Sequence, residues 1–590
     1  MKSPARLLSW LLAGCCGFAP VQAADPVAPG AALRALFDAE WERRLRDEPE
    51  AASYYGDTRY DERWTDLSLE AIAAREAAER EALGRLKAIP RARLATAEQI
   101  QYDSFLWLLQ AQVDRQAFRE YLLPVGHQSG PQTADRIAEV MPFNSAADYR
   151  RYLKRLSALP RQLAQVRVLM QEGLKAGHLP PRVLMERVPP QFAAQRVDDP
   201  AASPFYRPFK RMPTAMADAE QAALRAEALA LIRDRLVPAY RELGDFFSAE
   251  YLPRARPSIA ASDGRGGTAY YNFLARDYTT TPLSGEQIHA VGLREVDRLR
   301  AAMEKTKDEA GFKGDLAEFF TYLRSDPRFF YTTPAELLDA YRATAKRIDP
   351  ELVKVFKTIP RLPYGVRPIP ENIAPHTSTA YYQGGAADGT RPGYYYVNLY
   401  RPEVRPRWEM LPLSLHEAVP GHHFQISRAQ ELEAAPALLR NAYFVAYGEG
   451  WALYAEQLGY EMGLYDDAYD RFGQLTYEMW RAVRLVIDTG MHLKGWSREQ
   501  AIDYFKANAP KTEQDIVNEV DRYIGRPGQA LAYKIGQMKI SELRERARVK
   551  LGAKFDLREF NDTVLATGSV PLVVLETHID GWIAEQSAGR

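Results

Sequence analysis

The sequence predicts a mainly α-helical, multi-lobed protein with one small β-sheet next to a helix that carries His416 and Glu417. Apolar residues recur at helical spacing through most of 31–251 and 405–590. Short aromatic segments bounded by glycine and proline interrupt this pattern between 257 and about 400, and they are typical of strands. A chain of 590 residues is also longer than one minimal core requires, so several lobes are expected.

The order of these patterns predicts an N-terminal helical lobe over 30–255, a mixed region over 256–404 and a C-terminal helical catalytic lobe over 405–590. The last two can form one unit. Proline clusters near 198–213 and 252–257 mark loops or lobe boundaries. In the mixed region we expect a helix over 284–306, which Ser284 caps. Strands are expected in the segments SIAASDG (258–264), TAYYNF (268–273), STAYYQ (378–383) and GYYYVNLY (393–400).

The N-terminus is typical of an export signal, because Lys2 and Arg6 precede a short apolar stretch. Two endings are open: a signal peptide over 1–23, or a lipoprotein signal over 1–14 that leaves Cys15 to carry a lipid anchor. Either ending predicts an exported protein, in the periplasm or as an outer-membrane lipoprotein facing it. Cys15 and Cys16 are the only cysteines, so a metal site in the mature chain must use histidine and carboxylate.

The charge balance argues against a nucleic-acid partner. Lysine plus arginine number 77, as do aspartate plus glutamate, so the chain lacks the basic surplus of nucleic-acid binders. After the N-terminal signal, no apolar run reaches the roughly 18 residues that a membrane helix needs.

The segment LHEAVPGHHFQ, residues 415–425, contains the most informative motif. Histidines four residues apart share a helix face and can bind one metal ion. Here the histidines that follow His416 come six and seven residues later, about 9–10.5 Å along a regular helix, which is too far to share an ion. Pro420 and Gly421 disfavour a regular helix, so we predict a bulge over 419–421 that brings a later histidine back toward His416.

Two histidines can supply the second ligand. His422 follows a glycine, as the second ligand does in several helical zinc peptidases, and it is favoured. His423 would share the face of His416 on a straight helix, so it remains the alternative. Glu417 adjoins the first ligand and is the expected general base.

A third ligand is expected from a carboxylate on a neighbouring helix. Glu449 in AYGEGWALYAEQ fits, and the glycines beside it suggest a close approach of backbones. Glu456 lies two turns later and can hydrogen-bond a ligand histidine. His416, His422 and Glu449 therefore predict a catalytic site for one Zn²⁺ ion with an open position for water.

Further polar residues downstream are candidates for contact with the substrate. His492, Tyr523 and Tyr533 are expected to stabilise the developing oxyanion. Positively charged groups that can hold a substrate carboxylate are Arg522, Arg526 and Lys534. The segment 393–400 can offer its backbone to an extended peptide, with help from Tyr396 and Asn398.

These motifs together resemble the bacterial family named domain of unknown function 885, over roughly 30–585. The segments that carry the resemblance include LHEAVPGHHFQ, AYGEGWALYAEQLG, DGTRPGYYYVNLYRPEVRPRWEM and DRYIGRPGQALAYKIGQMKI. The resemblance implies a helical, zincin-like metallopeptidase fold with a cleft. The sequence is also distantly similar to the thimet-oligopeptidase and angiotensin-converting-enzyme types. Their motif is His-Glu-x-Gly-His, and the present motif carries two additional residues before Gly421 and His422. This implies metal-ligand and base roles for His416, Glu417, His422 and Glu449.

The expected function is a zinc-dependent hydrolase of the cell envelope that cleaves peptide bonds in short or unfolded peptides. Metal-activated water is the nucleophile, and a glutamate is the base. Two alternatives remain open: a metal-dependent amidase with a non-peptide substrate, and a non-catalytic envelope binding protein that retains the fold. The sequence does not predict an oligomeric state.

Overall fold

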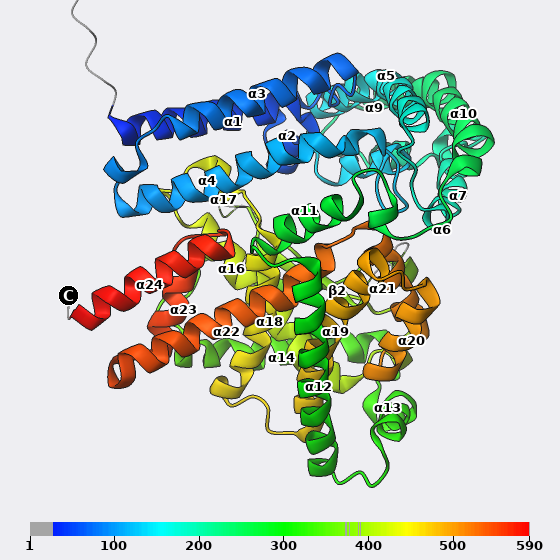
Figure 1. Cartoon of the computed structure of the whole chain (residues 1–590). Coiled ribbons are helices and arrows are strands. Elements are labelled where there is room, and N and C mark those ends of the chain that lie inside the picture. The colour runs from blue at the N-terminus through cyan, green and yellow to red at the C-terminus, as the bar shows by residue number, and fades with distance from the viewer. Residues whose placement is uncertain (1–27, 372–373, 377, 387–388, 390, 589–590) are drawn as a thin grey trace, which may run out of the picture.

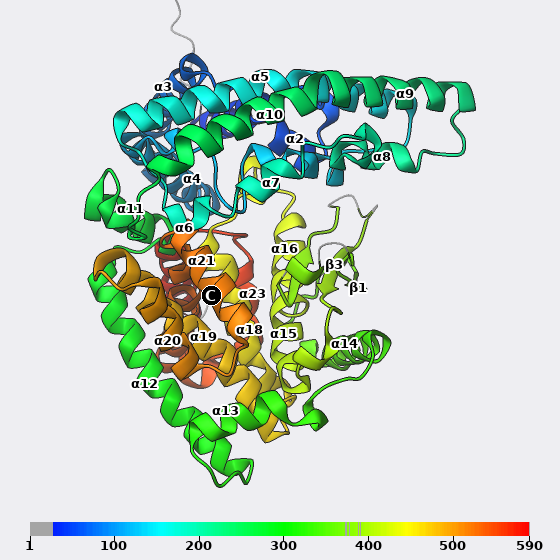
Figure 2. The same cartoon turned by 90° about the vertical axis from the view of Figure 1, so that its right-hand side faces the viewer.

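Helices from the first 250 residues form a layer above the rest of the chain (Figures 1 and 2). The computed structural model describes residues 28–371, 374–376, 378–386, 389 and 391–588. The helices of this upper layer are α1 (Pro29–Asp47), α2 (Pro49–Tyr54), α3 (Leu69–Lys87), α4 (Thr96–Arg115), α5 (Ala146–Ala176), α6 (Arg182–Met185), α7 (Pro189–Ala193), α8 (Arg207–Lys210), α9 (Asp218–Leu231) and α10 (Val237–Phe246).

The lower part contains the remaining helices and the sheet (Figure 2). Before the sheet lie α11 (Gly267–Thr279), α12 (Gly285–Glu309), α13 (Leu316–Ser325) and α14 (Pro334–Ile348). After the sheet follow α15 (Met410–Glu417), α16 (His422–Gln430), α17 (Ala437–Arg440), α18 (Val445–Met462), α19 (Ala468–Leu493), α20 (Arg498–Asn508), α21 (Glu513–Gly525), α22 (Ala532–Leu551), α23 (Leu557–Leu565) and α24 (Leu572–Ala588). The predicted mainly helical architecture with one small sheet is confirmed.

The sheet has three strands in the order β1-β3-β2, with bounds β1 (Tyr364–Pro368), β2 (Ala380–Gln383) and β3 (Gly393–Val397). The central strand β3 runs parallel to β1 and antiparallel to β2. One face of β3 buries Tyr395 and Val397 against α14 and α15, which places the sheet beside the helix that carries His416. Strand β2 is an edge of this sheet.

Two of the four predicted strands are wrong. The segment 268–273 lies in α11, because Tyr271, Leu274 and Ala275 follow the helical period and are buried together. The segment 258–264 contains only a short 3-10 turn, Ala261–Asp263. Strand β1 was not predicted, since its glycine and proline weaken the strand pattern. The helix predicted over 284–306 is confirmed as α12, which Ser284 caps.

The core of the lower part is built on two long helix pairs. Helix α12 packs along α19, and α18 packs along α22. The largest apolar core continues from α5 in the upper layer into α19 and α21, as Tyr152, Met479 and Val520 show. In the other direction, Leu438 and Leu439 of α17 join the core of α1 and α4. The upper layer and the lower part are therefore joined through shared cores.

The predicted signal segment, including Cys15, lies outside the described residues. Within the described ranges, no helix combines the length and apolarity that a membrane span requires.

Candidate metal centre

The helix that carries the His-Glu pair is broken between two of the predicted ligands. Helix α15 ends at Glu417, and α16 begins at His422. A side chain at Gly421 would place its Cβ only 1.8 Å from the carbonyl oxygen of His416, so the turn requires glycine. The indole Nε1 of Trp451 donates to the carbonyl oxygen of Pro420 at 2.8 Å and holds the turn. The predicted distortion is confirmed, although it is a complete break and not a bulge.

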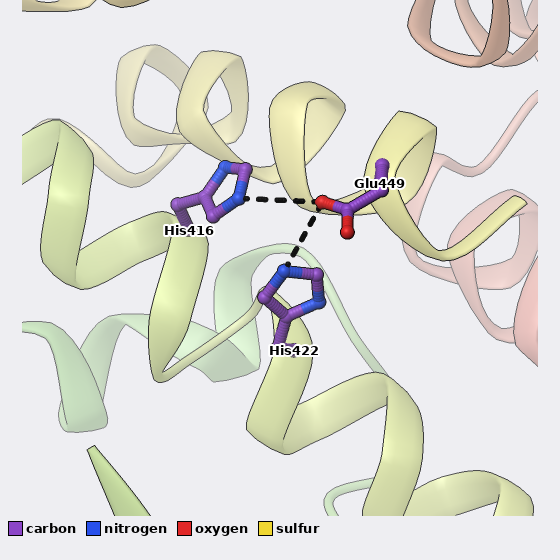
Figure 3. Close-up of side chains that lie close together, drawn as sticks. All are labelled: His416, His422 and Glu449. Carbon is purple, nitrogen blue, oxygen red and sulfur yellow. Dashed lines mark ion pairs between the residues drawn. The ribbon is translucent and has the colours of Figure 1, made fainter. Parts of the chain in front are cut away.

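This break brings His416 and His422 together with Glu449 from α18 (Figure 3). One ligand atom from each side chain lies within 4.8 Å of the other two. Nε2 of His416 is 3.8 Å from Oε2 of Glu449, and Nε2 of His422 is 3.4 Å from the same oxygen. Two imidazole nitrogens and a carboxylate oxygen that converge in this way form a donor set suited to zinc.

Glu456 orients the first histidine. Its Oε1 lies 2.8 Å from Nδ1 of His416, and the carboxylate is fully buried. The bond leaves Nε2 of His416 to face Glu449. Glu456 therefore contacts one of the two predicted ligand histidines, as expected.

His423, the alternative to His422, points away from this cluster. Its Nε2 donates to the carbonyl oxygen of Leu362 at 3.0 Å, and its Nδ1 lies 2.9 Å from the hydroxyl of Tyr382. Both ring nitrogens are thus bonded on the side of the sheet. The structure brings His422 to the cluster, because the chain restarts its helix at that residue.

Charge and burial set the protonation of the three side chains. Burial lowers the pKa of His416 well below its ordinary value, so the ring is neutral. Burial also disfavours the charged form of His422, but the Glu449 carboxylate outweighs it and raises the pKa. For Glu449, burial is in turn outweighed by His422, and the pKa is lowered. His422 and Glu449 therefore favour each other's charged form.

Glu417 lies beside the cluster and contacts the edge strand. Burial raises the pKa of its carboxyl to about 6, while a hydrogen bond from the backbone N–H of Tyr382 opposes this rise. Tyr382 is the third residue of β2. The predicted base therefore lies between the predicted metal ligands and the sheet.

Tyr443 is a residue at the site that the sequence analysis did not identify. Its hydroxyl donates to Oε1 of Glu449 at 3.3 Å, and 44% of its surface is reached by solvent. A Cβ at Gly448 would lie 2.5 Å from the Tyr443 ring, so this glycine gives the ring its place. In the sequence, Gly448 was the indication that a side chain packs across α18 at this point.

Gly450, which follows Glu449, allows two helices to pack closely. A Cβ at Gly450 would lie 2.5 Å from the backbone of Gly536, and a Cβ at Gly536 would lie 1.9 Å from the carbonyl oxygen of Ala446. Helices α18 and α22 thus cross in backbone contact beside Glu449. The predicted close approach of backbones is confirmed.

His492 does not belong to the site. Its Nδ1 accepts from the N–H of Ala261 at 3.0 Å, and its Nε2 donates to the carbonyl oxygen of Tyr523 at 3.1 Å. The ring is fully buried, and burial lowers its pKa to about 4. With both nitrogens bonded to backbone, His492 joins α19 to its neighbours and has no group left for an oxyanion.

The hydroxyl of Tyr523 is also fully used. It accepts from Nε of Arg484 at 2.7 Å and from the indole of Trp480 at 3.2 Å, and it donates to Glu519 at 2.5 Å. This saturates a phenol and corrects the expectation of an oxyanion donor there. Tyr533 is half-buried, with its ring centroid 4.3 Å from the Arg484 guanidinium, and burial together with the Glu449 carboxylate raises its pKa.

The positively charged groups differ in their access. Nζ of Lys534 is buried among Glu478 at 2.7 Å, Gln537 at 2.9 Å and Glu295 at 3.0 Å, so it cannot hold a substrate carboxylate. Arg522 forms two bonds to Glu519 and a third to Gln529. Arg526 is exposed.

The predicted peptide-binding strand is the central one and has no free edge. Strand β3 pairs with β1 on one side and β2 on the other, so β2 offers the open backbone instead. Asn398 is fully buried, and its amide donates to the carbonyl oxygens of Ala374 and Ser378. Tyr396 stacks on Tyr381 on the outer face of the sheet, with ring centroids 4.9 Å apart.

Comparisons with known proteins place the chain among solved structures of the same fold and in one family. A solved structure described as a "putative lipoprotein" from Colwellia psychrerythraea is similar to this chain, with 28% identity and a TM-score of 0.89. The match covers 95% of this chain and 100% of that one. A "putative lipoprotein of unknown function" from Shewanella oneidensis shares the fold, with 19% identity and a TM-score of 0.70 over 94% of this chain and 99% of that one. No curated protein gives a significant match. Residues 49–579 match the family described as "Bacterial protein of unknown function (DUF885)", and the chain therefore belongs to that family.

Proposed function

We propose that this protein is a zinc-dependent hydrolase of the cell envelope that cleaves peptide bonds in short or unfolded peptides. The observation that carries the proposal is the convergence of His416, His422 and Glu449 within 4.8 Å, with Glu417 beside them. Three protein ligands and an adjacent carboxylate are the composition of a catalytic zinc site, because one coordination position stays open for water.

The residues present fit a zinc ion. Imidazole nitrogen and carboxylate oxygen are ligands that zinc accepts, and Glu456 orients His416 as a buried carboxylate does in many zinc sites. When bound, the ion would lower the pKa of a coordinated water and polarise the scissile carbonyl.

Glu417 is the proposed proton carrier. A carboxyl with a pKa near 6 is partly ionised at neutral pH, so it can take a proton from water and pass it to the leaving amine. The backbone N–H of Tyr382 favours its ionised form. Tyr443 is the proposed donor to the carbonyl oxygen as that oxygen gains negative charge. A tyrosine hydroxyl has an ordinary pKa of about 10, so it is protonated at neutral pH and can donate.

Strand β2 is the proposed site for the peptide backbone. It is an edge strand, and its Tyr382 already contacts the proposed base. An extended peptide can add to such an edge through main-chain hydrogen bonds, which recognise peptides without a fixed sequence. The zincin-like metallopeptidase fold that the sequence predicts is part of this proposal.

An envelope location supports a peptidase of this kind. Two solved relatives are described as a "putative lipoprotein", and the N-terminal sequence predicts export. Mass spectrometry of the mature N-terminus tests the anchor, since a lipidated Cys15 and a free residue 24 differ in mass.

The function is tested by metal analysis together with a Glu417→Gln variant. We expect the purified protein to hold one zinc per chain and to digest a peptide mixture, with activity lost on chelation and restored by zinc. Glu417→Gln should keep the zinc and lose turnover at least about a hundredfold. The surface variant Glu461→Gln, which removes a carboxylate paired only with Arg544, is the matched control.

Two results would contradict the proposal. A protein that takes up no zinc would favour a non-catalytic binding function. A zinc protein that hydrolyses small amides but no peptide would favour the amidase.

A further inference from the structure

Two arginines share one carboxylate next to the candidate metal centre. Nη2 of Arg484 in α19 lies 2.9 Å from Oε2 of Glu519. Arg522 in α21 bonds the same carboxylate twice, through Nε at 3.2 Å and Nη2 at 2.9 Å. Two positive charges thus face one negative charge, which leaves one positive charge in surplus.

The hydrogen-bonding capacity of this group is incomplete. Arg484 is only 4% exposed, yet its Nη1 has no hydrogen-bond partner among the described residues. One turn earlier on α19, Nε of the buried Arg481 also lacks a partner among the described residues, and its Nη2 lies 3.9 Å from Oε1 of Glu456. A buried charged donor without a partner is costly, about 1–3 kcal/mol or more, so its presence requires an explanation.

A short chain of contacts connects Arg484 to the metal ligands. Its guanidinium lies 4.3 Å from the Tyr533 ring. One helical turn after Tyr533, Gly536 meets Gly450, the neighbour of Glu449.

This placement is unfavourable for a metal site unless an anion joins it. Fixed positive charges repel a divalent cation held nearby, and a bound carboxylate would offset that repulsion. A guanidinium forms strong, charge-assisted N–H···O bonds to carboxylates, and Nη1 of Arg484 can donate one such bond because Nε and Nη2 are already bonded. Peptides carry carboxylates at their C-terminus and on aspartate and glutamate side chains.

We infer that Arg484, assisted by Arg522, binds a carboxylate of the substrate, so that peptides with a carboxylate near the scissile bond are preferred. The inference rests on the proposed peptidase function and adds its substrate class. Arg522 was expected from the sequence to hold a carboxylate, but the unpartnered donor belongs to Arg484.

The test uses four peptides of one length: a free or an amidated C-terminus, each with glutamate or glutamine at the penultimate position. The wild type should cleave at least one carboxylate-bearing peptide with a kcat/KM at least about tenfold above that of the amidated glutamine peptide, a difference of about 1.4 kcal/mol. A gain from the free terminus alone identifies the terminal carboxylate, and a gain from glutamate alone identifies the side chain. Equal values for all four peptides would overturn the inference.

Arg484→Gln should reduce this preference to less than about threefold. Arg298→Gln, which removes an arginine paired with Glu478 and Glu295, should leave the preference unchanged. Arg484→Gln combined with Glu519→Gln removes one charge of each sign, which keeps the test valid if the single variant does not fold. A preference that survives in both Arg484 variants would contradict the assignment.

Binding separates this inference from the peptidase proposal. The affinity of the four peptides for Glu417→Gln is measured by calorimetry, without turnover. If no peptide is cleaved but carboxylate-bearing peptides still bind more tightly, the peptidase proposal fails and the inference stands. If peptides are cleaved but bind with equal affinity, the inference fails and the peptidase proposal stands.

Discussion

Nδ1 of His416 lies 2.8 Å from Oε1 of Glu456, and both side chains are buried. Because the bond occupies Nδ1, the other ring nitrogen is the one that faces Glu449 and His422. Glu456 itself lies on α18, two turns after Glu449, so one helix supplies both a proposed ligand and the group that orients another.

Replacing this carboxylate should weaken zinc binding without removing a ligand. We expect Glu456→Gln to lower zinc affinity about tenfold to hundredfold, because an amide is a weaker acceptor for the Nδ1 proton. A competition titration against a fluorescent chelator measures the effect. The surface variant Glu461→Gln should bind zinc like the wild type, and equal affinities for all three proteins would refute the role of Glu456.

The turn between the two histidines should tolerate no side chain. In Gly421→Ala the new Cβ would lie 1.8 Å from the carbonyl oxygen of His416, so the backbone must move. We expect the free energy of unfolding to fall by about 3 kcal/mol and zinc binding to be lost. Gly84→Ala is the matched control: nothing lies within 4 Å of that position in α3, and alanine there should stabilise by up to about 1 kcal/mol. Chemical unfolding of both variants measures the difference, and a stable, zinc-binding Gly421→Ala protein would contradict this reading of the turn.

Much of the metal centre could be predicted because its residues lie in two short segments with unusual spacing. Pro420 and Gly421 showed that the helix had to be interrupted, and Gly450 showed that backbones meet beside Glu449. The sequence favoured His422 but left His423 open, because the choice depends on the residue at which the helix restarts. A shift of one residue there would rotate a different ring toward His416 and Glu449.

Other parts of the site depend on contacts distant in sequence. Tyr443 carries no motif of its own, and only the packing of its ring on Gly448 places it next to Glu449. His492 looked catalytic because it is a histidine at helical spacing from Arg484, but Ala261 and Tyr523 occupy both of its nitrogens. The prediction of a strand at 268–273 was wrong, because the aromatic residues of this segment also fit a buried helix face.

Removal of the Tyr443 hydroxyl should slow catalysis without loss of zinc. If the hydroxyl donates to the developing oxyanion, Tyr443→Phe should lower kcat about a hundredfold and change KM little. The ring still fills the space over Gly448, so stability should be preserved. Tyr460→Phe, which alters another exposed tyrosine 45% open to solvent, should keep full activity. Steady-state kinetics decide, and an unchanged kcat in Tyr443→Phe would remove this residue from the mechanism.

Asp488 is a buried carboxyl away from the metal ligands. It accepts hydrogen bonds from the hydroxyl of Tyr271 at 2.5 Å and from the backbone N–H of Gly528 at 3.0 Å. Burial nevertheless raises its pKa to about 7, against these two bonds and the charge of Arg522. The folded protein therefore holds this carboxyl in its protonated form more tightly than the unfolded chain does.

A pKa raised by folding has a defined consequence for stability. The contribution of Asp488 is complete below its unfolded pKa near 4 and is lost as the pH rises through about 7. Between pH 5 and pH 8 the loss should be about 3 kcal/mol of unfolding free energy. Asp488→Asn keeps a neutral acceptor for both hydrogen bonds and cannot ionise, so this loss should vanish. Because the two proteins share every other titrating group, the difference between their urea unfolding curves at the two pH values isolates Asp488. Parallel pH dependences would mean that Asp488 is already ionised in the folded state.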